Sequence, residues 1–201
     1  MSYQITEQDI DEILNKPGKV RGVVFKTDYR FIVDKFGEGG VKRVEEELER
    51  MKCSFSYKDE IDNMSFYPIG MRTISLIAIH KALGIDREGI KEMGMNAPKF
   101  SLMIKFFMRH FLSPEKIFEK AGEMWEKHYT VGALKPTEMD LEKRCMKASI
   151  YDIELHPILS DYFCGYFSFI LKMGVGEDVS VVEEQKESED GNKYHEFTFT
   201  W

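Results

Sequence analysis

The chain has 201 residues and a formal net charge of −7, with 31% charged and 43% hydrophobic residues. This length suits one domain that buries roughly 70% of its unfolded surface. The negative charge excludes nucleic acid as the main partner, because such binders usually present a basic face. No apolar run reaches the roughly 18 residues of a membrane span, and the N-terminus lacks a secretory signal. We therefore expect a cytoplasmic protein without a membrane span.

The N-terminal segment predicts a short helix. Thr6 caps it, Asp9 completes the capping box, and Pro17 closes it. We treat residues 1–19 as an N-terminal arm and 20–201 as a single domain.

The first half of that domain is helical. The glycines of segment 37–40 separate two helical patterns, and segment 65–70 is predicted to be a loop before an apolar helix over 74–83. Asp86 caps a further helix, which Pro98 should break.

Two more helices complete this half. Segment 100–111 has apolar residues on most positions and is predicted to be buried. Ser113-Pro114-Glu115 marks a helix start, with a cap, a proline in the first turn and an acid near the positive end.

The second half changes to strands. Segments 134–140 and 144–153 form two of them, and Pro136 favours an edge position for the first. An aromatic helix follows from His156 to its glycine stop at Gly174.

A final hairpin closes the chain. Its first strand begins at Val179, a polar turn lies at 189–192, and apolar and polar residues alternate from Tyr194 to Trp201. The prediction is an α+β fold with helices packed on a C-terminal antiparallel sheet of about four strands, ending in a β-β-α-β-β tail.

Sequence signatures of catalysis are missing: the chain has no GxSxG, no phosphate-binding glycine loop and no dinucleotide fingerprint. We therefore predict that it is not an enzyme. Cys145 and Cys164 do not pair with a histidine at helical spacing, so no metal site is predicted.

Fifteen Phe and twelve Met can fill an irregular core or line an apolar cavity. His128 lies on the inner face of its helix beside Trp125 and Tyr129. A neutral imidazole there could ligate a haem iron or orient the polar end of a ligand. Arg72, in an apolar helix, could enter a pocket mouth and hold a carboxylate, although such side chains more often extend along their stems to water.

The chain resembles one superfamily in segments 20–25, 67–69, 165–167, 179–181 and 191–197. This superfamily contains the 4-vinyl reductase (4VR) domains, an uncharacterised family described from myxobacteria, the haem–nitric-oxide/oxygen-binding domains and the transport-protein-particle (TRAPP) subunits. The final hairpin lacks the cysteines usual in 4VR domains, and no Tyr-x-Ser-x-Arg motif follows His128 as in the haem-binding domains.

The resemblance implies a domain that encloses a small apolar molecule between helices and sheet and pairs with itself. The expected function is non-enzymatic small-molecule binding or sensing, as a homodimer that signals through a partner protein. Two alternatives stay open: a TRAPP-like interaction scaffold with a solid core, and a haem-based gas sensor using His128. The pocket is expected to be lined by Phe106, Phe107, Met124, Trp125, His128, Tyr162, Phe163 and Tyr166.

Overall fold

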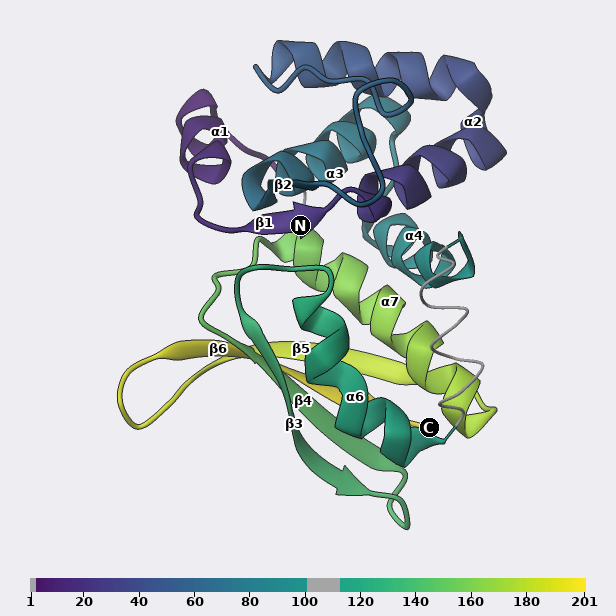
Figure 1. The fold of residues 1–201 in the computed structure, drawn as a ribbon, viewed down its shortest axis with the longest axis vertical. Coiled ribbons are helices and arrows are strands. Elements are labelled where there is room, and N and C mark those ends of the chain that lie inside the picture. Colours follow the sequence, from purple (N-terminus) through teal and green to yellow (C-terminus); the bar gives the residue numbers. More distant parts are fainter. Residues whose placement is uncertain (1–2, 101–112) are drawn as a thin grey trace.

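The computed structural model describes residues 3–100 and 113–201. Its helices are α1 (Glu7–Leu14), α2 (Val23–Arg50), α3 (Ile69–Leu83), α4 (Arg87–Phe100), α6 (Pro114–Glu126) and α7 (Pro157–Val175). Its strands are β1 (Lys19–Arg21), β2 (Phe66–Pro68), β3 (Ala133–Asp140), β4 (Cys145–Tyr151), β5 (Ser180–Glu187) and β6 (Lys193–Thr200). In Figure 1 a helical region with α1, α2 and α3 lies above the sheet, and α4 and α7 lie between them.

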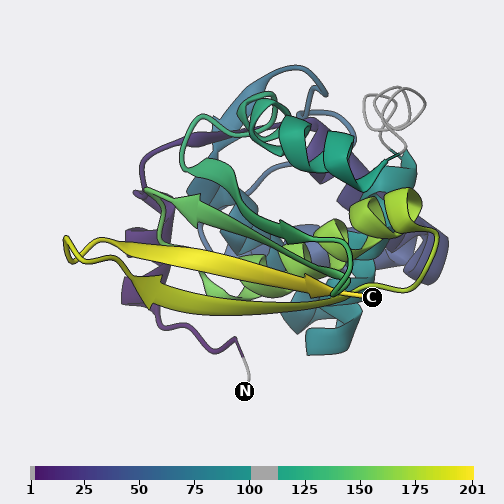
Figure 2. The same cartoon turned by 90° about the horizontal axis from the view of Figure 1, so that it is seen from below.

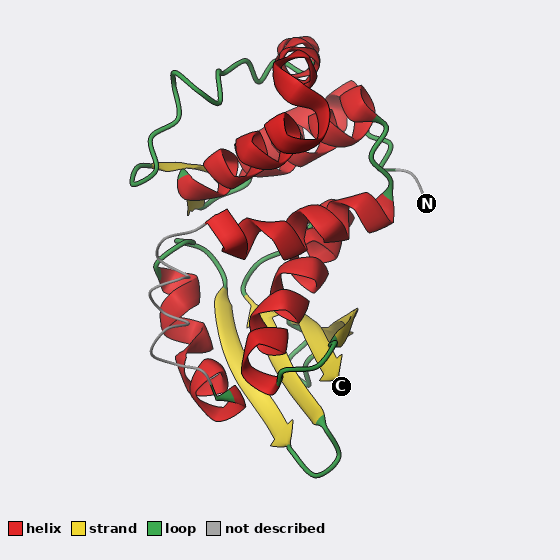
Figure 3. Cartoon of the chain, turned by 90° about the vertical axis from the view of Figure 1, so that its right-hand side faces the viewer, coloured by secondary structure: helices red, strands yellow, loops and turns green. Residues whose placement is uncertain are grey.

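The α+β prediction is confirmed. The four C-terminal strands form one antiparallel sheet in the order β3-β4-β6-β5, and α7 connects its two hairpins. Pro136 lies in β3 at the edge of the sheet, as expected, where the register shifts between Pro136 and Glu138. Figure 3 shows the sheet and the helical region as separate layers.

One face of the sheet is covered by α6 and α7. In Figure 2 α6 lies above the strands, and α7 runs behind them to the right-hand side. Alternation places His195, Phe197 and Phe199 of β6 on the covered side, and all three are buried. Met146, Ala148 and Ile150 of β4 are buried beside them. The sheet and the two helices therefore enclose one apolar interior.

Capping residues near the ends of α6 and α7 determine where these two helices begin or end. The Ser113 hydroxyl accepts a hydrogen bond from the Lys116 N–H at the start of α6. The imidazole of His156 caps α7 through the Ile158 N–H, and Gly176 ends the helix in a left-handed conformation. The start of α7 is buried as predicted, whereas its last turns are half-exposed or exposed.

Two details of the helical region differ from the prediction. Helix α4 continues past Pro98 to Phe100, because the proline lies in the last turn and the helix is held along α7. Segment 65–70 contains the short strand β2, which pairs with β1. The separation of two helical patterns by glycine is confirmed: α2 consists of two helical parts with a break at Gly37, where φ is +65°. The expected helix over 100–111 lies almost wholly outside the described residues.

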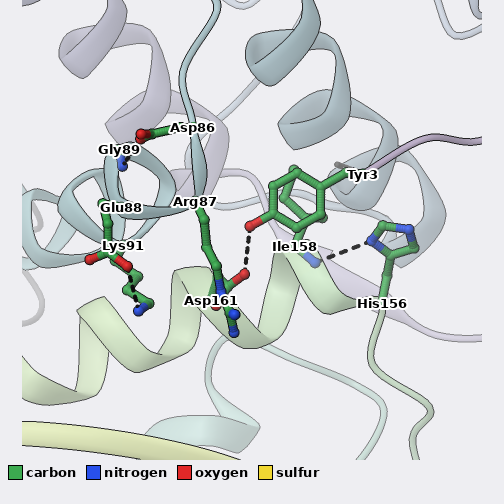
Figure 4. Close-up of polar contacts among 9 residues, drawn as sticks. All are labelled: Tyr3, Asp86, Arg87, Glu88, Gly89, Lys91, His156, Ile158 and Asp161. Atoms are coloured by element: carbon green, nitrogen blue, oxygen red, sulfur yellow. Dashed lines mark hydrogen bonds and ion pairs between the residues drawn. The ribbon is translucent and has the colours of Figure 1, made fainter. Parts of the chain in front are cut away.

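The N-terminal segment packs on the same chain. Ile10 and Ile13 of α1 are buried, and the helix lies against α3. The Tyr3 hydroxyl donates to one Asp161 carboxylate oxygen at 2.5 Å, and the Arg87 Nε donates to the other at 2.7 Å (Figure 4). This cluster joins the N-terminal segment and α4 to the start of α7. Within residues 3–100 and 113–201, no helix is long and apolar enough to cross a membrane.

Candidate ligand-binding site

A cavity of about 130 Å³ lies between α6, α7 and the covered face of the sheet. Ile117, Phe118 and Ala121 of α6 form one wall, and residues of α7 form the wall opposite. The sheet and the start of α2 complete the lining with Leu134, Met146, Phe199, Val24 and Thr27. The lining is almost entirely apolar, as expected for a site that binds through burial.

Six of the eight residues expected at the pocket line this cavity: Met124, Trp125, His128, Tyr162, Phe163 and Tyr166. Phe106 and Phe107 lie outside the described residues. Five of them lie on α6 and α7, where residues three and four apart share a helix face. His128 was expected on the helix itself but lies in the turn after α6. That these residues bind a ligand stays a prediction. Sequence analysis missed the walls from the sheet and α2, although the alternation in β4 and β6 indicated which strand residues point inward.

Three aromatic side chains, from the end of α6, the turn after it and α7, pack against one another. The Trp125 ring stacks on Tyr129 at 4.2 Å and lies 5.4 Å from the Phe163 ring. The Trp125 Nε1–H lies 3.0 Å from the Val131 carbonyl oxygen and 3.1 Å from that of Gly132. Its one ring donor is thus used within the fold, and the indole presents apolar surface to the cavity.

The ring of Tyr162 packs against a buried ion pair formed by Arg72 and Asp28. The Arg72 guanidinium carbon lies 4.5 Å from the centre of the Tyr162 ring, within cation–π range. Arg72 pairs with Asp28 of α2, and both side chains are essentially fully buried. Arg72 neither reaches water nor lines the cavity, so both roles considered for it were wrong: α3 is enclosed by α2 and α7, which leaves the side chain no path to solvent.

The polar groups around the cavity are uncharged. Burial raises the pKa values of Tyr129 and Tyr162 to about 12 each, and raises that of Tyr166 as well. Burial lowers the pKa of His128, which keeps the imidazole neutral. Among the described residues, no Asp, Glu, Lys or Arg lines the cavity. An ionised ligand would lose its hydration without compensation.

The described residues do not fit a haem. Pockets for cofactor-sized ligands occupy roughly 300–1,000 Å³, whereas this cavity has about 130 Å³. A haem also carries two carboxylates, and the described lining offers them no cation. Among the described lining residues, His128 is the one histidine, although methionine and tyrosine side chains of the same lining can also ligate haem iron. No group of three or more potential metal ligands occurs within the described ranges.

No known protein family and no curated protein matches the sequence. Solved structures do match the fold. One was studied for haem redox potential and porphyrin distortion: TM-score 0.61, 16% identity, covering 90% of this chain and 97% of that chain. A variant of the T. tengcongensis H-NOX domain has a TM-score of 0.61 and 17% sequence identity, and the match covers 90% of this chain and 96% of that chain. An oxygen-binding H-NOX domain related to soluble guanylate cyclases has a TM-score of 0.57 and 16% sequence identity, and the match covers 89% of this chain and 91% of that chain.

H-NOX denotes the haem–nitric-oxide/oxygen-binding domains, one of the groups that the sequence resembles. The likeness to 4VR domains and TRAPP subunits stays a prediction. At 16–17% identity, what the comparisons establish is that this chain shares the H-NOX fold.

Proposed function

We propose that the protein is a non-enzymatic sensory domain that binds a compact, mainly apolar molecule in the cavity between α6, α7 and the sheet. The observation that carries the proposal is the cavity itself, about 130 Å³ with an apolar lining. The H-NOX fold supports it, since solved structures with this fold include an oxygen-binding domain.

The volume limits the ligand. In another protein, an apolar cavity of about 150 Å³ binds benzene or xenon. A space of about 130 Å³ therefore suits a molecule of about one aromatic ring. The cavity also argues against the scaffold alternative, which requires a solid core.

Toluene is the first probe, and Trp125 is the natural reporter because its ring lies on the cavity wall. In a Trp201→Phe background it is the only remaining tryptophan. We expect saturable quenching of its fluorescence by toluene, together with a higher melting temperature.

Two variants control this titration. Ala121→Leu places a larger side chain at the cavity wall and should weaken toluene binding at least several-fold. Glu119→Leu adds a similar side chain on the exposed side of α6 and should leave binding unchanged. The proposal would be refuted if toluene gave no saturable quenching and native mass spectrometry found no co-purifying molecule.

A sensory role requires that ligand binding in the cavity change an interaction with another protein chain. We propose that the chain pairs with itself through its helices and signals through a partner protein. Light scattering with and without toluene measures the self-association, and a mass equal to the 23.5 kDa monomer under both conditions would rule out the dimer.

A haem-based gas sensor is the second candidate, favoured by the solved structures that share the fold and by His128 on the cavity wall. The cavity volume and uncharged lining oppose it. Visible absorption spectra after haem addition decide the matter: we expect no Soret band that depends on His128. A band that shifts on binding and is lost in His128→Ala would make haem the leading candidate.

A further inference from the structure

Two hydrogen-bonding groups around the cavity are committed to the fold. The Trp125 ring donor faces two carbonyl oxygens. The Thr27 hydroxyl donates to the Val24 carbonyl oxygen at 2.7 Å. The hydroxyls of Tyr129, Tyr162 and Tyr166 also belong to lining residues, and each can donate or accept a hydrogen bond. His128 differs from them, because one of its ring nitrogens can only accept.

The imidazole of His128 has one defined tautomer. Its Nδ1 lies 2.9 Å from the Met124 carbonyl oxygen. A carbonyl oxygen can only accept, so Nδ1 carries the hydrogen and donates it. In a neutral imidazole the second nitrogen, Nε2, then has no hydrogen and presents a lone pair.

The position of His128, in the turn after α6, directs that lone pair away from this helix. The two ring nitrogens point in nearly opposite directions, and Nδ1 is bonded back to α6. His128 is buried and lines the cavity. Within the described part of the chain, the Met124 carbonyl is the only hydrogen-bond partner of this ring.

We propose that the cavity selects neutral, ring-sized molecules that carry one hydrogen-bond donor, such as a phenolic hydroxyl, and that Nε2 of His128 accepts this hydrogen bond. The proposal rests on the proposed function and narrows its ligand class. Neutrality follows from the uncharged lining, since a buried charge needs a partner. The donor follows from Nε2 of His128, which can only accept a hydrogen bond, whereas the tyrosine hydroxyls of the lining can pair with a donor or an acceptor.

Phenol and toluene separate this proposal from general apolar binding, because they have nearly the same shape and only phenol has a donor. The variant is His128→Phe, which keeps a ring of similar size and removes the acceptor. It should weaken phenol binding roughly 3- to 10-fold relative to its effect on toluene, the contribution of one net hydrogen bond. Trp125 fluorescence, excited at the red edge of tryptophan absorption, provides the readout in the Trp201→Phe background.

A measurement on the unmodified protein covers the case in which His128→Phe does not fold. Nitrogen NMR of the histidine rings should show the unprotonated Nε2 resonance of His128 moving upfield when phenol is added and staying in place with toluene. Benzoate, which has the same ring and a negative charge, should bind at least tenfold more weakly than phenol.

The outcomes are distinguishable. If neither toluene nor phenol binds, the proposed function fails together with the inference. If both bind, but His128→Phe affects them equally or the Nε2 resonance does not move with phenol, the donor preference is wrong and the cavity remains a binding site. Benzoate binding as tight as phenol binding would overturn the restriction to neutral molecules.

Discussion

Arg72 and Asp28 show how a single buried pair constrains the helical region. Arg72 Nε and Nη2 and Asp28 Oδ1 have no hydrogen-bond partner among the described residues. A buried pair of this kind adds little net stability, but removing one partner leaves an uncompensated charge. The pair therefore specifies how α2, α3 and α7 meet more than it stabilises the fold.

Asp28→Ala should lower the free energy of unfolding by about 3–5 kcal/mol, because the guanidinium of Arg72 is then buried without a counter-charge. Urea unfolding measures the loss. The double variant Asp28→Leu with Arg72→Met removes both charges and should recover most of it. Equal instability of the single and double variants would show that packing, rather than charge, causes the effect.

His128 should make stability depend on pH. Because burial lowers its folded-state pKa, the unfolded imidazole, with a pKa near 6.5, binds the proton more readily than the folded one. Stability is therefore full above about pH 6.5 and falls as the pH is lowered, by up to about 1.4 kcal/mol per pH unit for one group. His156 contributes in the same direction.

Urea unfolding at pH 7 and pH 5 measures this dependence. His128→Phe should lose less stability between the two values than the parent protein does. Lys42→Gln, a change at an exposed residue of α2 that does not influence the imidazole, should lose as much as the parent. An unchanged loss in His128→Phe would assign the pH dependence to other groups.

At the scale of elements, the contact between α4 and α7 depends on two glycines that allow the helices to approach closely. A Cβ at Gly165 would overlap the Lys91 carbonyl oxygen, and one at Gly94 would overlap the Tyr162 carbonyl oxygen. Both obstacles are backbone atoms, which cannot move without separating the helices. This contact fixes the position of α7 against α4, whose Ala97 also lines the cavity.

Gly165→Ala should destabilise the protein by at least about 1–3 kcal/mol through overpacking. Gly39→Ala is the matched control, since a Cβ there meets no atom within 4 Å. In that helical position alanine should be neutral or stabilise by about 0.5–1 kcal/mol. Thermal unfolding of the two variants compares them directly, and similar melting temperatures would contradict the close approach.

At the scale of the whole molecule, α7 connects two regions: its start is held by Tyr3 and Arg87 through Asp161, and its aromatic side chains line the cavity. A ligand in the cavity contacts α6, α7, the sheet, the start of α2 and Ala97 of α4, but not α1 or α3. A bound ligand should therefore stabilise the region of α6 and the sheet more directly than the region of α1 and α3.

Hydrogen exchange with saturating toluene should show this difference. A ligand at 100 times its dissociation constant adds about 2.7 kcal/mol to global stability. Amides that exchange by local opening should slow in α6 and in β4, whereas locally opening amides of α1 should exchange at an unchanged rate. Uniform slowing of α1 and α6 would mean that both regions open as one unit.

The sequence by itself determined the elements whose signals are local. The Ser113 cap, the His156–Pro157 start and the alternation from Tyr194 to Trp201 predicted α6, α7 and β6, because caps and side-chain periodicity act within a few residues. The same periodicity identified the faces of α6 and α7 that line the cavity. An edge position for the strand containing Pro136 followed from its missing N–H.

Only the tertiary structure decided what depends on contacts between distant segments. The continuation of α4 past Pro98, the pairing of β2 with β1 and the burial of Arg72 against Asp28 all require partners far along the chain. The cavity belongs to the same class: the number of Phe and Met residues is compatible with a solid or a hollow interior. The volume of the cavity depends on the packing distances between α6, α7 and the sheet, and the periodicity of the sequence carries no information on those distances.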